Sequence, residues 1–252
     1  MRRPCSRWTC PPPGSHDVTN AIGHTMNNAT EVAEYFDRLA GSWNSRFTAS
    51  GSMRNRLARF QSALSSRLAA GAKVLDFGCG TGDITAACAS AGFQVVGVDR
   101  SVQMIERARA NHNHGQIRFE ALSEGPGAGR LPFGENEYAG VLASSVLEYI
   151  SDLSSCFAEM HRVTAPGAWM FVTVPNVCHP IRIAEWLALK LAPFLEPVLP
   201  PRLRSHLLYI RLSVNRFGVN RWVALLRSRQ WECVEVSGYL QPLLMIVSRK
   251  AS

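Results

Sequence analysis

The chain has 252 residues, of which 46% are hydrophobic and 18% charged, so it can bury the core of one α/β domain, and wholesale disorder is excluded. The net charge of +8 is concentrated in two segments, because residues 1–25 carry +2 and residues 177–222 carry +5. The nearly neutral remainder argues against a protein that follows a phosphate backbone, and we expect no nucleic-acid partner.

The seven cysteines are scattered, without a CxxC pair or zinc-ligand spacing, so we expect free thiols in a reducing, cytoplasmic compartment. Residues 1–25 are basic but lack the apolar stretch of a secretory signal, and we expect a disordered tail there. No apolar run is long enough to span a membrane.

Residues 26–70 form the expected helical N-terminal arm. The first predicted helix begins near residue 29, where apolar side chains recur at three- and four-residue spacing at Val32, Tyr35, Phe36 and Leu39. The second predicted helix covers residues 53–68 and repeats this spacing.

After residue 70 the pattern changes to short apolar runs that alternate with turns and helical segments. Five such runs read KVLDF (73–77), QVVGVD (94–99), IRFEA (117–121), YAGVLAS (138–144) and AWMFVTV (168–174). This alternation predicts βαβ units around a parallel sheet buried on both faces. Two final runs within residues 223–252 have no helix between them and predict an antiparallel hairpin that closes the sheet. We therefore expect a Rossmann-like α/β fold with a seven-stranded, mostly parallel sheet and helices on both faces.

The segment VLDFGCGTG (74–82) joins the first predicted strand to a helix and places three glycines at the sheet edge where α/β proteins bind ligands. Asp83 stands where a dinucleotide site needs a small residue, so a ligand without a pyrophosphate is favoured. Asp99 ends the second strand, where a carboxylate can accept both hydroxyls of a ribose.

Four ordered segments resemble the class I S-adenosylmethionine-dependent methyltransferases. They are VLDFGCGTG, VDRSVQMIERAR, LPFGENEYAGVLASSVLEYISD and MHRVTAPGAWMFVTVPN, and they fall within residues 71–176, the predicted cofactor-binding core. The resemblance implies S-adenosyl-L-methionine as cofactor. It also implies cofactor contacts at Tyr35, Asp76, Gly78, Cys79, Gly80, Thr81, Gly82, Asp99, Arg100, Met104, Ala121, Leu122 and Ser144. One departure is the acid after the third strand, which is displaced to Glu120 or replaced by Ser123.

Methyl transfer from a sulfonium requires alignment and exclusion of water more than a fixed catalytic dyad. Many relatives have LEH where this chain has LEY, so Tyr149 replaces a histidine, and its ordinary pKa near 10 makes it a poor base. His179, after the fifth strand, is the better candidate base. The missing histidine also weakens a divalent-metal site, and we expect no metal.

The segment 177–222 is long, apolar and basic. A short apolar helix over residues 181–195 is expected to end at its prolines, beginning with Pro193. Three interpretations remain open: a lid packed on the core, a roof over a hydrophobic acceptor, or peripheral membrane contact through residues 181–201.

The arrangement of arm, core and insertion is similar to two branches that methylate polyprenylated catechols and a magnesium-porphyrin propionate. We expect methyl transfer to a hydrophobic small molecule, to oxygen first, with a carbon or nitrogen acceptor as the alternative. A catalytically silent cofactor-binding protein is the alternative from another class. An RNA substrate is disfavoured by the neutral core, and the sequence indicates no oligomeric state.

Overall fold

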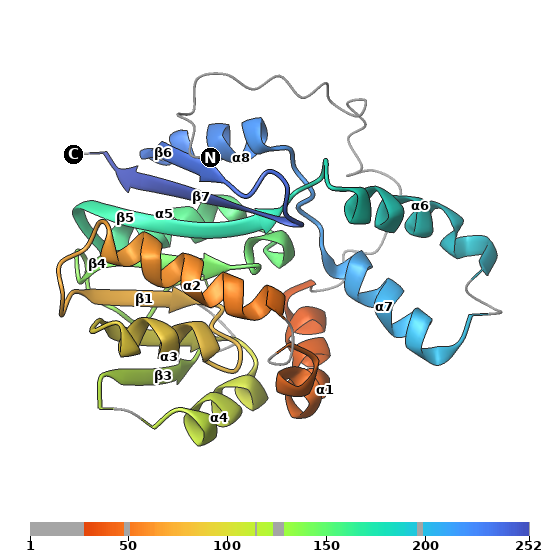
Figure 1. Cartoon of the computed structure of the whole chain (residues 1–252), viewed down its shortest axis with the longest axis horizontal. Helices are drawn as coiled ribbons and strands as arrows, with labels where there is room; N and C mark the ends of the chain where they lie inside the picture. Colours follow the sequence, from red (N-terminus) through yellow and green to blue (C-terminus); the bar gives the residue numbers. More distant parts are fainter. Residues whose placement is uncertain (1–27, 48–50, 114, 123–128, 196–198, 252) are drawn as a thin grey trace.

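The central element is a seven-stranded sheet with the strand order β3-β2-β1-β4-β5-β7-β6 (Figure 1). The computed structural model describes residues 28–47, 51–113, 115–122, 129–195 and 199–251, so the predicted tail lies outside the described residues. The strands are β1 (Lys73–Phe77), β2 (Gln94–Asp99), β3 (Ile117–Ala121), β4 (Tyr138–Ser144), β5 (Thr164–Pro175), β6 (Trp231–Ser237) and β7 (Leu243–Lys250).

The pairing directions confirm the predicted topology. β1 pairs in parallel with both β2 and β4, and β5 continues the parallel series next to β4. β7 runs antiparallel between β5 and β6, so the last two strands form the predicted hairpin. Because the first five strands are parallel, their carboxyl ends lie at one edge, where an α/β sheet binds ligands.

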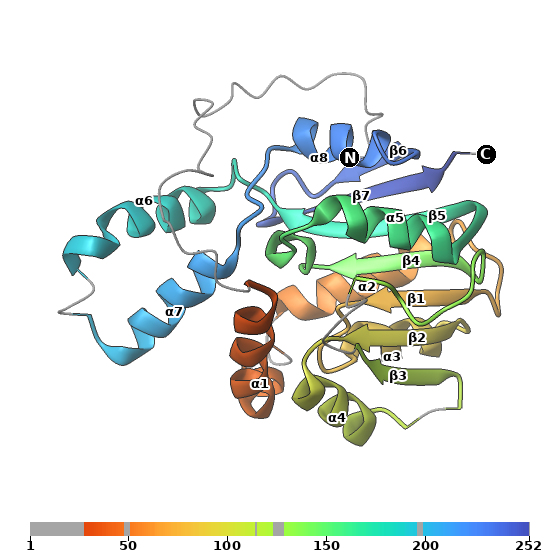
Figure 2. The same ribbon diagram turned by 180° about the vertical axis from the view of Figure 1, so that it is seen from behind.

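The helices cover both faces of this sheet. They are α1 (Asn28–Phe47), α2 (Gly51–Ser65), α3 (Asp83–Ser90), α4 (Val102–Asn111), α5 (Leu153–Val163), α6 (Pro180–Leu195), α7 (Pro201–Leu212) and α8 (Val219–Arg227), with a 3-10 turn, η2 (Leu147–Tyr149). One face buries Phe60 and Leu64 of α2 with Cys88 of α3, and the opposite face buries Phe157 of α5 with Trp222 of α8 (Figures 1 and 2). Burial on both faces explains why the strands read as continuous apolar runs.

The first helix crosses the carboxyl edge of the sheet (Figures 1 and 2). Asp37 anchors it to the start of α4, since its carboxylate accepts hydrogen bonds from the Ser101 hydroxyl and the Gln103 N–H. Ser101 also caps α4, because its Oγ accepts the Met104 N–H at 3.1 Å. The arm is therefore held over the sheet edge by polar contacts at α4.

The helices α6 and α7 form an antiparallel pair that extends beyond the sheet at the same edge (Figure 1). α6 ends at Leu195, among the prolines that were expected to terminate it, although Pro193 itself lies within the helix. Pro193 lies in the last turn, where it removes one N–H from the helix hydrogen bonds and so weakens the end of α6. Within the described residues, no helix is both long and apolar enough to cross a membrane.

Candidate functional site

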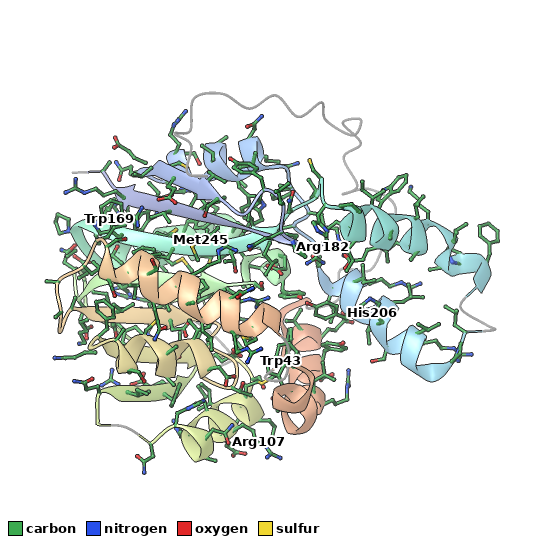
Figure 3. The ribbon with its side chains drawn as sticks, in the orientation of Figure 1. Trp43, Arg107, Trp169, Arg182, His206 and Met245 are labelled. Carbon is green, nitrogen blue, oxygen red and sulfur yellow. The ribbon has the colours of Figure 1, made fainter. Side chains whose placement is uncertain are left out.

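A cavity of about 1270 Å³ opens at the carboxyl edge of the sheet. Its lining comes from α1, α2, η2, α6 and α7, from the loops after β1 and β2, and from the turn between β6 and β7. Figure 3 shows Trp43, Arg182 and His206, from α1, α6 and α7, near this edge. Because ligand pockets usually measure about 300–1,000 Å³, the cavity has room for more than one small molecule.

The glycine loop presents bare backbone to the cavity at two alternate positions. Gly78 has φ +72°, and a Cβ there would lie 2.4 Å from Cγ2 of Val146, so only glycine fits. Gly80 has φ +55°, and a Cβ there would meet no atom of the described residues within 4 Å, which leaves open space above it. The N–H groups of Gly78 and Cys79 both donate to the Val98 carbonyl, and these bonds fix the loop to β2.

The other predicted loop contacts face the protein rather than the cavity. Cys79 packs with the cluster around Phe119, and the Thr81 hydroxyl donates to the Asp83 carboxylate at 2.7 Å. Gly82 begins α3 with φ +81°, and a Cβ there would meet the Phe119 ring at 2.6 Å. Cys79, Thr81 and Gly82 are absent from the cavity lining, so they shape the loop from behind.

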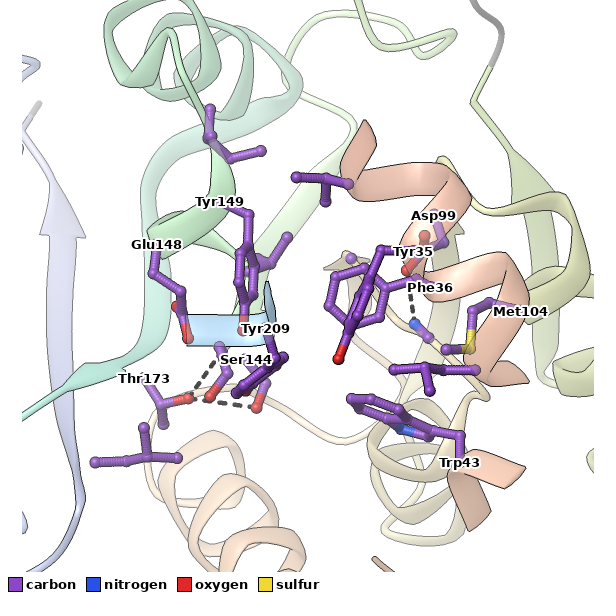
Figure 4. Close-up of a pocket in the computed structure, with 18 of the residues that line it drawn as sticks. Tyr35, Phe36, Trp43, Asp99, Met104, Ser144, Glu148, Tyr149, Thr173 and Tyr209 are labelled. Atoms are coloured by element: carbon purple, nitrogen blue, oxygen red, sulfur yellow. Dashed lines mark hydrogen bonds between the residues drawn. The ribbon is translucent and has the colours of Figure 1, made fainter. Parts of the chain in front are cut away.

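Asp99 lines the cavity with its carboxylate already oriented. One oxygen accepts the Gly80 N–H and the other accepts the Ser101 N–H, both at 2.9 Å. Figure 4 shows Asp99 at its end of the cavity with the first of these bonds. Burial raises the pKa of Asp99, while these N–H groups oppose the rise. Each carboxylate oxygen can accept a second hydrogen bond, so Asp99 fits the two hydroxyls of a ribose.

The remaining predicted cofactor positions divide into two groups. Those that line the cavity are Tyr35, Arg100, Met104, Leu122 and Ser144. Ala121 and Asp76 do not. Asp76 is 1% exposed beneath the loop, where it accepts the Thr85 hydroxyl at 2.7 Å, and burial raises its pKa to about 7. Glu120, the displaced acid, pairs with Arg118 at 2.8 Å and is likewise not part of the lining.

Hydroxyl groups at the ends of β4 and β5 form the floor of the other end of the cavity (Figure 4). Ser145 has φ +54°, an unusual conformation for a serine, and its N–H donates to the backbone oxygen and the hydroxyl of Thr173. The hydroxyls of Ser144 and Thr173 lie 3.3 Å apart. Neighbouring strands therefore hold a strained, polar turn under the cavity.

Glu148 was missed by the sequence analysis and lies beside this floor. Its side chain is buried at 3% exposure and lines the cavity, and its Oε2 has no hydrogen-bond partner among the described residues. Burial raises the pKa of its carboxyl to about 7, although nearby guanidinium groups oppose the rise. The signal for it in the sequence is the acid inside the segment LEY (147–149), next to Tyr149.

The two predicted catalytic residues lie in different places, one in the cavity lining and one outside it. Tyr149 lines the cavity, but burial raises its pKa well above its ordinary value, which makes proton abstraction harder. His179 is outside the cavity lining, and its Nδ1 accepts the Ile181 N–H at 3.3 Å at the start of α6. His179 thus caps the start of α6, and its role as a base stays a prediction.

Aromatic rings lie between the two ends of the cavity (Figure 4). Phe36 makes edge contacts with Trp43 and Tyr149 at ring-centroid distances of 5.5 and 5.4 Å, and Tyr35 lies 6.2 Å from Tyr209. These rings join α1 to η2 and α7 and give the middle of the cavity an aromatic wall. In the part of the chain that the structure describes, no three His, Cys, Asp or Glu side chains are grouped to hold a metal ion.

Comparisons with known proteins place the chain among methyltransferases. A family model described as a methyltransferase domain matches residues 50–233, more than half of the chain. An O-methyltransferase of ubiquinone biosynthesis from Thiobacillus denitrificans is 34% identical over 109 residues, which are 42% of this chain and 46% of that protein. A C-methyltransferase of ubiquinone/menaquinone biosynthesis from Desulfotalea psychrophila is 34% identical over 147 residues, 56% and 57% of the two chains. The chain thus spans about half the length of these relatives.

A solved structure shares the fold. The 1,6-didemethyltoxoflavin N1-methyltransferase of Burkholderia thailandensis, solved with 1,6-didemethyltoxoflavin and S-adenosylhomocysteine, has a TM-score of 0.59 at 17% identity and covers 92% of this chain and 94% of its own. The three relatives are named for transfer to oxygen, carbon and nitrogen, so similarity alone does not select the accepting atom.

Proposed function

Because this chain belongs to the methyltransferase-domain family of S-adenosylmethionine-dependent enzymes, we propose that it transfers a methyl group to an oxygen atom of a hydrophobic small molecule. One observation carries this proposal: a single cavity joins the Asp99 end to the Glu148 end. The first end has the groups that suit a nucleoside, and the second has a buried carboxylate among aromatic rings and hydroxyls.

Several of the predicted contact residues support S-adenosylmethionine at the cofactor end. Asp99 would hold the ribose, the bare backbone of Gly78 and Gly80 would lie under the methionine, and Met104 would contact the adenine. When bound, this cofactor supplies a methyl carbon whose bond to sulfur breaks with its electron pair going to sulfur, while a lone pair of the acceptor forms the new bond. The chain's own task is to align the acceptor, exclude water and remove a proton.

Glu148 is the group we assign to proton removal. A hydroxyl acceptor must lose its proton as the new bond forms, and a carboxylate with a pKa near 7 can take it at neutral pH. The buried Oε2, which has no partner among the described residues, supports this role, since it can accept a hydrogen bond from a bound hydroxyl. Tyr149 and Tyr209 would confine the acceptor between aromatic walls.

A labelling experiment tests both the reaction and the accepting atom. The full chain is incubated with S-adenosylmethionine carrying a radiolabelled methyl group and with fractionated lipid and polar extracts, and labelled products are then treated with hydriodic acid. Transfer to oxygen yields volatile labelled methyl iodide, whereas a carbon-bound methyl group stays in the product.

Two outcomes separate the alternatives. Label that resists hydriodic acid would identify a C- or N-methyltransferase. Cofactor binding by calorimetry with no label in any fraction would favour a catalytically silent binding protein.

A second candidate function, docking on an anionic membrane surface, is supported by the exposed face of α6. Large apolar side chains there are about half exposed or more, and they are Ile181, Ile183, Trp186, Leu187, Leu191 and Phe194. The segment 177–222 carries a net charge of +5, which complements anionic lipid headgroups. An apolar face with basic neighbours is the pattern of a helix that lies in the membrane interface.

Vesicle sedimentation tests this docking. We expect the full chain to sediment with phosphatidylglycerol vesicles and to remain in solution with phosphatidylcholine alone. Trp186→Asp with Phe194→Asp should abolish sedimentation, whereas Leu240→Asp, at a 95% exposed leucine outside α6, should leave it unchanged. Equal sedimentation of both variants would rule out α6 as the docking element.

A further inference from the structure

We propose that the methyl acceptor carries a carboxylate, and that Arg56 and Arg182 bind this carboxylate at the Glu148 end of the cavity. The inference rests on the proposed function and deepens it, because it names the chemical class of the acceptor. It concerns a second group on the acceptor, separate from the hydroxyl that receives the methyl group.

Arg56 brings a positive charge to the cavity from α2. It belongs to the cavity lining, and within the described part of the chain no hydrogen bond or ion pair satisfies its guanidinium. Burial lowers its pKa, because water is removed from the charge, and the positive charge of Arg182 lowers it further, whereas Glu148 opposes the change. A guanidinium has five donors, so an uncompensated one in a cavity strongly favours an anionic ligand.

Arg182 reaches the same end from α6 and is only partly satisfied. Its Nη1 donates to both oxygens of Glu185 at 2.9 Å, while its Nε is buried without a partner in the described structure. The same Glu185 carboxylate lies 3.5 Å from Nη1 of Arg216. One carboxylate is therefore shared by two guanidinium groups, and a positive charge remains beside the cavity.

The charges at this end do not balance. Arg59 also lines the cavity, and its Nη1 donates to the neutral side chain of Gln241 at 2.6 Å. Among the described residues, three guanidinium groups line this end of the cavity, and a fourth, that of Arg216, contacts the lining residue Glu185. The three in the lining belong to Arg56, Arg59 and Arg182, and the carboxyl groups beside them are those of Glu148 and Glu185. Even when Glu148 is ionised, the net charge of these six groups is positive.

A carboxylate on the acceptor supplies the missing charge with suitable geometry. Planar carboxylates accept two parallel hydrogen bonds from one guanidinium, which fixes the orientation of the ligand as well as its position. Glu148 and Arg56 are close enough to influence each other's pKa. Glu148 and Arg56 can therefore bind two groups of one acceptor, with the hydroxyl at Glu148 and the carboxylate at Arg56.

Binding measured by fluorescence tests the inference without turnover. The full chain is saturated with S-adenosylhomocysteine and titrated with 6-hydroxy-2-naphthoate, with 6-hydroxy-2-naphthamide as its neutral counterpart. We expect the naphthoate to bind at least about tenfold more tightly, as a charge-assisted contact would give. Arg56→Gln should remove most of this preference, Arg56→Lys should restore part of it, and Arg182→Gln should reduce it.

Matched controls exclude an effect of general surface charge. Arg54→Gln removes an exposed arginine from the same helix and should leave the tenfold preference unchanged. Affinity for S-adenosylhomocysteine, measured by calorimetry, should change less than about twofold in Arg56→Gln, since the carboxylate subsite is at the acceptor end.

The outcomes distinguish failure of the inference from failure of the proposed function. Equal affinity for naphthoate and naphthamide in the unmodified protein overturns the inference and leaves methyl transfer intact. Loss of S-adenosylhomocysteine binding in Arg56→Gln, with the naphthoate preference retained, also overturns it, because the arginine would then serve the cofactor. If the unmodified protein does not bind S-adenosylhomocysteine, the proposed function fails, and titration without it still measures the naphthoate preference.

Discussion

The two ends of the cavity are built in different ways. The Asp99 end draws mainly on two neighbouring strands and the loops that follow them, within residues 73–104, with α1 closing over it. The Glu148 end combines α2, η2, α6, α7 and the turn between β6 and β7, which are spread over residues 51–243. The first end is thus set by local chain geometry, and the second depends on how distant elements pack together.

The largest expected effect is at the acceptor end. Glu148→Gln should lower kcat by about 10³-fold, within the range for removal of a general base, and should leave cofactor affinity unchanged. Because the base must be ionised, kcat of the unmodified enzyme should rise with pH up to a pH near 7 and level off above it, and this inflection should vanish in the variant. A pH profile that keeps its inflection in Glu148→Gln would assign the base elsewhere.

Two glycines of the same loop should differ in their effect on stability. Gly78→Ala should lower the free energy of unfolding by about 3 kcal/mol, because it combines a left-handed backbone with a clash against Val146. Gly80→Ala places alanine in the same left-handed backbone region but causes no clash, so it should lower the free energy of unfolding by only about 1 kcal/mol. Urea unfolding measures both, and adding Val146→Ala to Gly78→Ala should recover the part due to the clash. Equal losses at the two glycines would contradict the loop geometry.

Asp99→Ala should weaken binding of the cofactor at one end of the cavity and leave binding at the other end unchanged. Affinity for S-adenosylmethionine should fall about 100-fold, since a charged acceptor of two ribose hydroxyls is removed. Calorimetry measures this loss, and binding of 6-hydroxy-2-naphthoate to the same variant serves as the control, with little change expected. Unchanged cofactor affinity would remove Asp99 from the cofactor site.

The last predicted effect concerns stability and pH at Asp76. Burial raises its pKa from 3.8 to about 7 in the folded protein, so the folded state binds a proton more readily than the unfolded chain. Stability therefore falls as pH rises from the unfolded pKa to the folded one. Asp76→Asn should remove this contribution, so that its stability relative to the unmodified protein rises by about 2–3 kcal/mol between about pH 5 and pH 8. Urea midpoints at both pH values test it, and a constant difference between the two proteins would contradict the assignment.

Much of the fold and one end of the site could be predicted from local patterns. Alternating apolar runs and turns predicted the parallel strands and the final hairpin, because a strand buried on both faces must be apolar throughout. Asp99 and the glycines could be located because their place after β1 and β2 follows from the strand positions alone. Family membership, confirmed by the match over residues 50–233, depends on the same short segments.

Local sequence patterns were enough to predict the order of the strands along the chain, the expected cofactor edge and the family. The packing of distant elements sets which side chains meet at the acceptor end. It leaves Cys79 and Thr81 outside the cavity lining, uses His179 as a helix cap, and brings Glu148 together with Arg56 and Arg182. The difference arises from how far apart in the chain the determining residues are. A turn or a strand end is specified by a few adjacent residues, whereas the burial and charge of Glu148 depend on helices more than thirty residues away on either side of it in the chain.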